Sequence, residues 1–521
     1  MKKRFLRCFS VPAALFCMTV LSPFQAAFPV SAEGEAEEKV YNGMVYEISE
    51  DGTSVTIMYC TDDLPAELVI PSEIDGLPVT GFSQMAFYNR ENLTSVTIPE
   101  TVTSFGMQTF LSCKNLKTVN LPAGLTSIDE GAFAMCTSLE SITLPDGLKE
   151  IGNLVFSGCT ALKEINIPAS VDTFGEPAFG ETPWLEAKKA ENPLVVVNDI
   201  LLCCDGTEHV TVPEGVKAIA PYAFGWESKS PLTEIDLPDS LTRLMYVAFA
   251  YCPNLKTIHY SENLTDIERF AFDGTAWLDD RRAEDPFVVV NGVLVDATTL
   301  TGDVTIPDTV KIIGEGAFWG FSEEGGVTDV VIPDSVTEIR ANAFYDCEKL
   351  EKVTLPETVR TIEKNVFENC KSLTEITLPK SVREIGRTAF YGCEALREIT
   401  ILNPNCSIYD SFDTIASGMD FDTWTTYFNG EIVGYDNSSA QRYAEKYSYQ
   451  FRSLGGAPAV EYDFNSDSAF DISDAVVFAK YLSESLAPEE VPADALLDTS
   501  DLDGNGLLTL QDLRLLLQKL A

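Results

Sequence analysis

The chain has 521 residues, of which 45% are hydrophobic and 22% charged, and its formal net charge at pH 7 is −44. Because that length exceeds one ordinary hydrophobic core, it predicts several domains or an array of repeats. The 80 acidic residues, against 36 Lys and Arg, disfavour binding to nucleic acid or to anionic lipid. The only histidines are His209 and His259, which nearly excludes a triad with a histidine base and most zinc sites. We expect both histidines to be surface residues.

The first 32 residues have the pattern of a signal peptide. Basic residues precede the short apolar segment Val11–Leu21, and small residues suited to cleavage stand at Val30–Ala32. The apolar segment is well short of the roughly 20 residues that span a bilayer. The sequence therefore predicts a signal peptide over residues 1–32, a secreted chain, and an N-terminal cap region over residues 33–63.

A repeat organises residues 64–402. Each unit contains a short L-x-x-I-x-L strand closed by proline, a second extended V-x-x-I piece, and a turn that carries Ala-Phe and Cys. The phenylalanines that mark the phase, mostly 23 residues apart, are Phe87, Phe110, Phe133, Phe156, Phe179, Phe224, Phe249, Phe272, Phe318, Phe344, Phe367 and Phe390. One unit is too small to bury its own apolar face, so stacked units must share a core. The pattern predicts a mainly β solenoid.

The cysteines follow the same phase. They recur at Cys113, Cys136 and Cys159, at Cys252, and at Cys347, Cys370 and Cys393. Side chains in such a ladder run parallel instead of facing each other, so the spacing favours buried free thiols over disulfides.

Two longer repeats interrupt the array, over residues 181–212 and 275–306. They match each other at an offset of 93 residues, which superimposes Trp184 on Trp277. Each predicts a short helix around the Trp, followed by a strand and hairpin that join the stack. We expect the tryptophans to be hydrophobic plugs and not ligand platforms.

The outward strand positions carry small polar side chains of mixed charge. In three successive repeats they are Thr94, Ser95 and Thr97, then Lys117, Thr118 and Asn120, then Glu140, Ser141 and Thr143. They show no stripe of aromatic residues for stacking on sugar rings. A protein partner is the favoured ligand, and a passive spacer stays an alternative.

The 23-residue frame, with its Ile-Pro, Ala-Phe and Cys positions, resembles the BspA-type leucine-rich repeats of bacterial surface and secreted proteins. The resemblance covers roughly residues 64–402 and implies an extended binding or adhesion surface without catalysis. Residues 403–454 resemble the closing segment of such arrays. In that segment we expect a short helix near Tyr443 to cap the end of the core.

Beyond a flexible linker at residues 455–458, residues 459–521 contain two acidic twelve-residue loops, each followed by an apolar helix. Loop positions 1, 3, 5, 7, 9 and 12 can supply the six to eight oxygen ligands that calcium prefers. In the first loop these positions are Asp463, Asn465, Asp467, Ala469, Asp471 and Asp474. In the second loop they are Asp501, Asp503, Asn505, Leu507, Thr509 and Asp512. Position 7 acts through its backbone carbonyl, and the pair predicts two bound Ca²⁺ ions.

The paired loops resemble a dockerin, the small all-α module with EF-hand-like loops that binds cohesin domains on the cellulosome scaffolds of anaerobic bacteria. Asp at position 12 fits the family, whereas Ser468 stands where Gly is usual at position 6. The residues that the resemblance places against cohesin are Ile472, Ser473, Ala479 and Lys480, and Leu510, Gln511, Leu517 and Gln518. The two sets differ, which argues against a symmetric dual binding mode.

The leading interpretation is a secreted, non-catalytic binding or adhesion subunit that docks onto a cellulosome or cell surface through cohesin. The repeats would present a face to an unidentified protein or cell-surface ligand, and polysaccharide breakdown would be linked to the chain only by association. Two alternatives stay open, a polysaccharide-degrading accessory enzyme and a structural spacer or inhibitor of the same complex. Accidental carboxylate pairs are guaranteed by 80 acidic residues, but the repeats leave no separate catalytic domain.

Overall fold

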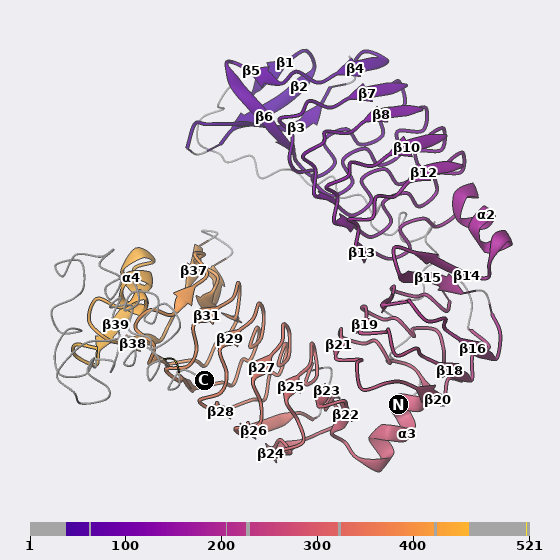
Figure 1. The fold of residues 1–521 in the computed structure, drawn as a ribbon. Coiled ribbons are helices and arrows are strands. Elements are labelled where there is room, and N and C mark those ends of the chain that lie inside the picture. Colours follow the sequence, from indigo (N-terminus) through magenta and orange to yellow (C-terminus); the bar gives the residue numbers. More distant parts are fainter. Residues whose placement is uncertain are drawn as a thin grey trace. The chain divides into compact units, whose positions relative to one another are not determined.

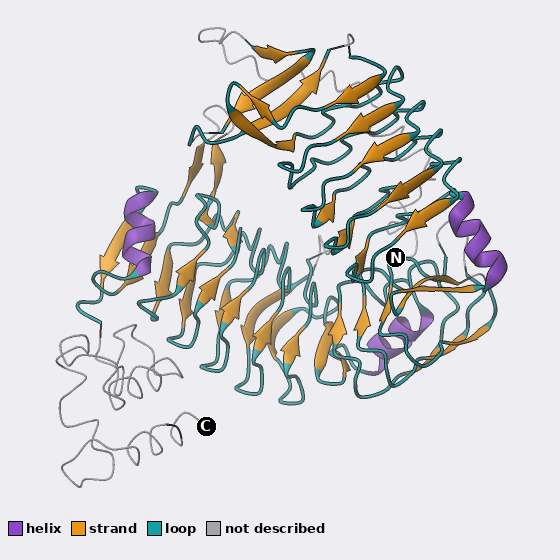
Figure 2. Cartoon of the chain, turned by 45° about the horizontal axis from the view of Figure 1, so that its top comes forward, coloured by secondary structure: helices purple, strands orange, loops and turns teal. Residues whose placement is uncertain are grey.

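A computed structural model describes residues 38–49, 51–61, 64–204, 206–225, 230–320, 325–420 and 425–457, together with Leu517. The chain divides into two compact units, Met1–Asp280 and Arg281–Ala521, and both consist mainly of short strands stacked side by side (Figures 1 and 2). This confirms the mainly β solenoid of leucine-rich repeats. The predicted signal peptide and the two calcium loops lie outside the described residues.

The first unit begins with a sheet in the order β1-β2-β3-β6-β5. Its strands are β1 (Lys39–Tyr41), β2 (Met44–Ile48), β3 (Val55–Cys60), β5 (Glu73–Ile74) and β6 (Leu77–Phe82). Neighbours pair antiparallel except β3 and β6, which are parallel. The parallel pair starts the stacking direction that the repeats continue.

The repeats of the first unit contribute strands to two parallel rows. The first row contains β4 (Glu67–Val69), β7 (Ser95–Thr97), β8 (Thr118–Asn120), β10 (Ser141–Thr143), β12 (Glu164–Asn166), β16 (His209–Thr211), β18 (Glu234–Asp236) and β20 (Thr257–His259). The second row contains β9 (Ser127–Ile128), β11 (Glu150–Ile151), β13 (Thr173–Phe174), β17 (Ala218–Ile219), β19 (Arg243–Leu244) and β21 (Asp266–Ile267). The register pairs equivalent positions of adjacent repeats, as in Val96↔Val119.

The second unit repeats this arrangement. Its first row contains β24 (Gly302–Thr305), β26 (Val327–Val331), β28 (Lys352–Thr354), β30 (Glu375–Leu378), β33 (Glu398–Ile401), β38 (Glu431–Gly434) and β39 (Gln450–Ser453). Its second row contains β25 (Ile312–Ile313), β27 (Glu338–Ile339), β29 (Thr361–Ile362), β31 (Glu384–Ile385) and β34 (Ser407–Ile408). Two small pairs lie beside them, parallel β32 (Phe390–Tyr391) with β35 (Ile415–Ala416) and antiparallel β36 (Gly418–Asp420) with β37 (Thr425–Tyr427).

Both longer repeats contain the expected helix and hairpin. In the first, α2 (Pro183–Glu191) is followed by antiparallel β14 (Leu194–Val197) and β15 (Ile200–Cys204). In the second, α3 (Ala276–Glu284) is followed by antiparallel β22 (Val288–Val290) and β23 (Val293–Asp296). The second strand of each hairpin pairs in parallel with the next repeat, which returns the chain to the stack.

Stacked phenylalanine rings form the centre of the core. Rings of successive repeats lie nearly parallel, with centroids 4.7–5.9 Å apart. This separation is close to the ~4.8 Å between neighbouring strands, so each ring covers the ring of the repeat before it. Trp184 lies against Phe179 and Trp277 against Phe272, at 4.7 and 4.6 Å. Both tryptophans are buried, which confirms their role as plugs.

The cysteines of the ladder are buried free thiols, as the spacing predicted. Six of the ladder thiols donate a hydrogen bond to the carbonyl oxygen of the preceding repeat's phenylalanine, as from Cys113 to Phe87 at 3.1 Å and from Cys393 to Phe367 at 3.1 Å. The exception is Cys252, which lies 3.7 Å from the carbonyl oxygen of Ala250. Burial raises the pKa of Cys113 and of Cys393 to about 12. The thiols therefore stay protonated and act as small apolar groups with one satisfied donor.

In the turns of the repeats, two positions adopt the left-handed backbone conformation, with positive φ. One position holds Gly131 (φ 62°) and then Leu154 (φ 55°), and the other holds Met135 (φ 58°) and then Gly158 (φ 72°). A side chain in this region costs roughly 1–2 kcal/mol. The stack imposes the turn shape even where the sequence does not provide glycine.

A helix closes the second unit, as expected for its C-terminal segment. The helix α4 (Ser439–Lys446) begins after Ser438, whose hydroxyl accepts a hydrogen bond from the Gln441 amide. Ala440, Tyr443 and Ala444 are buried against the core. The Tyr443 hydroxyl donates to the Ser411 carbonyl oxygen at 2.8 Å and accepts from the Ile415 amide at 3.2 Å. The helix therefore covers apolar surface that no further repeat would cover.

Shortening one central ring should weaken the whole stack. Phe133 is fully buried between Phe110 and Phe156, so Phe133→Ala should lower the free energy of unfolding by about 3–5 kcal/mol. Urea unfolding measures this change. The control Val69→Thr alters an outward side chain that is 70% exposed and should change stability by less than about 0.5 kcal/mol. Equal effects of the two variants would contradict the stacking account.

The free-thiol ladder predicts a simple thiol count. A chain without residues 1–32 loses Cys8 and Cys17 and keeps eleven of the 13 cysteines. After unfolding in denaturant without reductant, all eleven should react with a thiol reagent. In the folded chain at neutral pH the ladder thiols should be protected, because burial raises their pKa. A shortfall of two thiols for each disulfide would refute the prediction.

Candidate functional site

The outward face of the first strand row is the candidate binding face. Most of its strands bury the middle residue and leave the two beside it exposed or half-buried, as Val119 lies between exposed Thr118 and Asn120. Ser141 and Thr143 are likewise exposed around buried Ile142. The outward positions expected from the sequence are exposed or half-buried in the structure, so that prediction is confirmed.

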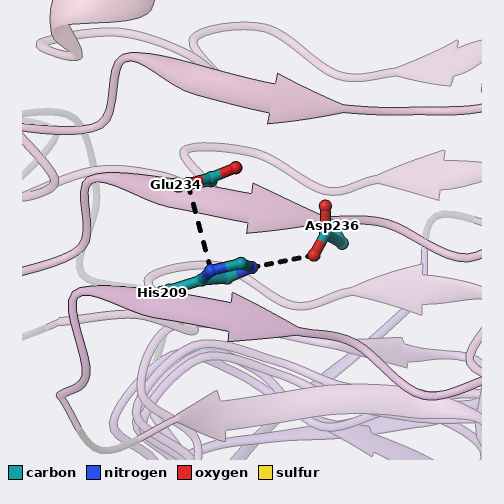
Figure 3. Close-up of side chains that lie close together, drawn as sticks. All are labelled: His209, Glu234 and Asp236. Carbon is teal, nitrogen blue, oxygen red and sulfur yellow. Dashed lines mark hydrogen bonds and ion pairs between the residues drawn. The ribbon is translucent and has the colours of Figure 1, made fainter.

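On strands β16, β18 and β20, this face brings both histidines together. Strand β18 lies between β16 and β20, all parallel. The register forms two rows across the three strands, His209-Glu234-Thr257 and Thr211-Asp236-His259. The central strand thus supplies two carboxylates, and each flanking strand supplies one imidazole from a different row (Figure 3 shows His209 with both carboxylates).

The shortest contacts run diagonally between the rows. His209 Nε2 lies 2.8 Å from Asp236 Oδ2, and His259 Nε2 lies 3.2 Å from Glu234 Oε1. Longer contacts complete the group, 3.9 Å from His209 Nδ1 to Glu234 Oε2 and 4.0 Å from His259 Nε2 to Asp236 Oδ1. The Thr211 hydroxyl donates to Asp236 Oδ2 at 3.1 Å. We call His209, Glu234, Asp236 and His259 the histidine–carboxylate cluster.

The carboxylates change the protonation of the cluster. The hydrogen bond to Asp236, assisted by the charge of Glu234, raises the pKa of His209. The same hydrogen bond lowers the pKa of Asp236, and Thr211 adds to that effect. All four side chains are between 40% and 58% exposed, so solvent screens these interactions. The cluster is open to ligands from solution.

Sequence reasoning placed both histidines at the surface, which is confirmed, but it did not bring them together. The signal was present in the three tripeptides His209-Val-Thr, Glu234-Ile-Asp and Thr257-Ile-His. Each occupies the same phase of its repeat, so alignment of the three repeats would have placed them side by side. A count of the histidines over the whole chain does not show that the two lie close together.

Two half-buried carboxyl groups elsewhere have unusual protonation. Desolvation raises the pKa of Glu176 and of Glu368 to about 7, partly offset by hydrogen bonds from Tyr222 and Thr388. Glu176 belongs to the first unit and Glu368 to the second. Each contact ties a repeat to a later one, so we interpret these carboxyls as structural.

The calcium-ligand positions and most of the proposed cohesin-facing positions lie outside the described residues. Of those positions only Leu517 is described, and it is helical and exposed. Within the described part, none of the helices is long and apolar enough to cross a membrane.

The fold and its polar face define the class of this protein as a leucine-rich-repeat solenoid. The model of the BspA type leucine rich repeat region matches residues 80–201, 198–288 and 296–413. The chain belongs to this family, which is a repeat family and not a catalytic one.

Several solved leucine-rich-repeat proteins are similar. The protein from T. pallidum is 25% identical, over 46% of this chain and 90% of its own, with a TM-score of 0.28. One from Bacteroides ovatus is 20% identical, over 80% and 99%, with a TM-score of 0.27. A leucine rich cell surface protein from Faecalibacterium prausnitzii is 22% identical, over 78% and 97%, with a TM-score of 0.27. No curated protein matches the chain.

The coupling between His209 and Asp236 predicts a measurable titration. A histidine with a raised pKa adds stability at pH below its unfolded pKa of about 6.5, and that contribution is lost as pH rises through the folded value. Asp236→Asn removes the charged acceptor, so the pKa of His209 should fall, as followed by NMR of the imidazole protons. The control Thr211→Val keeps the carboxylate and should change the pKa much less. An unaltered His209 pKa in Asp236→Asn would show that the pair is not formed.

Proposed function

We propose that this chain is an extracellular binding or adhesion protein that performs no catalytic step and presents the polar face of its solenoid to a protein partner. The observation that carries the proposal is the outward face itself, where strands such as β8, β10 and β16 expose polar residues on both sides of a buried middle position. Because neighbouring strands are ~4.8 Å apart, the face offers a regular array of donors and acceptors. An extended partner can contact many repeats at once.

The composition of the face favours a protein over a polysaccharide. The outward positions of β7, β8, β10, β12, β16, β18 and β20 hold Ser, Thr, Asn, Asp, Glu and His, and none holds Phe, Tyr or Trp. Sugar rings are commonly bound by stacking on aromatic side chains, which these strands do not offer. Mixed hydrogen-bonding and charged groups instead give specificity through complementary partners.

The tail supplies the second half of the proposal, a calcium-dependent dockerin over residues 459–521. The donor set supports it, because the first loop contains four aspartates at ligand positions and the second contains three. Hard carboxylate and carbonyl oxygens in this number suit Ca²⁺. The ions would hold the two loops in shape, and the cohesin-facing residues would then contact a scaffold protein.

The C-terminal cap makes this arrangement physically reasonable. Strand β39 ends at Ser453, and Gly455 (φ 94°) and Gly456 follow it. The solenoid core is therefore closed before the proposed dockerin begins. Docking through the tail would leave the outward face of the repeats available, and the N-terminal signal-like segment would direct the whole chain to the cell exterior.

Loss of both calcium loops should abolish docking. The double variant Asp463→Ala with Asp501→Ala removes the first ligand of each loop, and its affinity for cohesin should fall by roughly 100-fold or more because metal binding and folding are coupled in so small a domain. The measurement is calorimetry of the full chain against a panel of cohesins, with and without calcium.

The matched control is Glu489→Ala with Glu490→Ala, which removes the same charge between the loops and should bind normally. Retained affinity in the loop variant would defeat the docking proposal. If the unaltered chain takes up calcium but binds none of the cohesins, the calcium sites stand and the cohesin partner is wrong.

A further inference from the structure

The histidine–carboxylate cluster contains the only two histidines of a 521-residue chain, and both point at the same two carboxylates. His209 contacts Asp236 and Glu234 from β16, and His259 contacts the same pair from β20. We propose that this cluster binds one divalent transition-metal ion of the zinc type on the outward face of the solenoid.

The chemistry of the donors selects the class of ion. Imidazole nitrogen and carboxylate oxygen are established zinc ligands, and imidazole also suits Ni²⁺, Cu²⁺ and Co²⁺. Calcium and magnesium prefer oxygen ligands alone, so the two imidazoles discriminate against them. Two carboxylates with two neutral imidazoles carry a charge of −2, which one divalent ion neutralises.

The distances allow one ion to be shared. Two ligands at about 2.0–2.1 Å from a tetrahedral zinc ion lie roughly 3.3 Å apart. The four contacts within the cluster measure 2.8, 3.2, 3.9 and 4.0 Å, which brackets that value. One ligand atom each of His209, Glu234 and Asp236 lies within 4.8 Å of the others, and His259 is not part of this group of three. These three side chains therefore form the primary ligand set, and His259 can join it by rotation from its contacts with the same two carboxylates.

The backbone holds these side chains in place before an ion arrives. Their strands are short and parallel, and the middle residues Val210, Ile235 and Ile258 are buried in the core. The outward residues on either side cannot turn inward without exposing that apolar row. Such a site on strands loses little entropy on binding compared with one on loops.

An acidic group elsewhere on the same kind of face shows the contrast. Glu398 and Glu431 on neighbouring strands both pair with Arg452, at 2.6 Å each. There a permanent cation of the chain already neutralises the carboxylates. Among the described residues, the ion pairs with Glu234 and Asp236 are formed by the two histidines. A metal ion can take the place of the protons on these imidazoles.

The test is zinc titration of the full chain by calorimetry, in buffer with excess calcium so that the proposed tail loops are filled. The unaltered chain should bind one Zn²⁺ that the double variant His209→Gln with His259→Gln binds at least 100-fold more weakly. Both imidazoles are exposed, so the variant should keep its fold, which circular dichroism verifies. Asp236→Asn should also weaken binding.

The matched control is Glu398→Gln with Glu431→Gln, which removes the acidic pair on strands β33 and β38 of the second unit. This variant should bind zinc as the unaltered chain does. Co²⁺ provides a second readout, since imidazole ligation in tetrahedral geometry gives visible absorption that the histidine variant should not show. No zinc uptake, or equal uptake by the unaltered chain and the histidine variant, would overturn the proposal.

Discussion

The structure depends on one constraint, that a repeat of about 23 residues cannot bury its own apolar side chains and must use its neighbours. A phenylalanine ring that buries 150–250 Å² contributes roughly 4–6 kcal/mol before entropy is subtracted. An exposed ion pair, in contrast, contributes about 0–1 kcal/mol. The ring stack therefore decides the architecture, and the thiol ladder beside it fills space and satisfies a phenylalanine carbonyl in successive repeats, as at Cys113, Cys136 and Cys159. Each end of a stack must then be covered, as α4 does in the second unit.

The same constraint leaves the outward positions free to vary. Their side chains are exposed or half-buried on the outward side of the strands, so replacing Thr or Asn by His or Glu leaves the buried middle residues in place. The histidine–carboxylate cluster shows how a site can arise in this way, because the tripeptides of three neighbouring strands bring two imidazoles into contact with the same two carboxylates. The family to which the chain belongs fixes the stack, and the residues on its face carry what is particular to this protein.

Much of the fold could be predicted from the sequence because the governing signal is periodic. The frame located the strands, the phenylalanine and cysteine ladders, and the buried Trp184 and Trp277 with their helices and hairpins. It could not show that Leu154 and Val247 occupy left-handed turn positions, because neighbouring repeats impose that geometry against the residues' own preference. It also missed the cluster, since residues 25 positions apart become neighbours only once the register between β16 and β18 is known. The calcium-loop and cohesin assignments rest on sequence alone and stay predictions.

Removal of one whole repeat tests the stacking constraint most directly. Deleting residues 117–139 takes out 23 residues and joins Leu116 to Glu140, which keeps the phase of the array. Urea unfolding of this variant, compared with a variant lacking only residues 117–128, is the decisive measurement. The account predicts that the first variant folds cooperatively with Phe110 stacked on Phe156, whereas the second loses its structure. If the in-phase deletion unfolds as readily as the out-of-phase one, the shared core between repeats is not what holds this chain together.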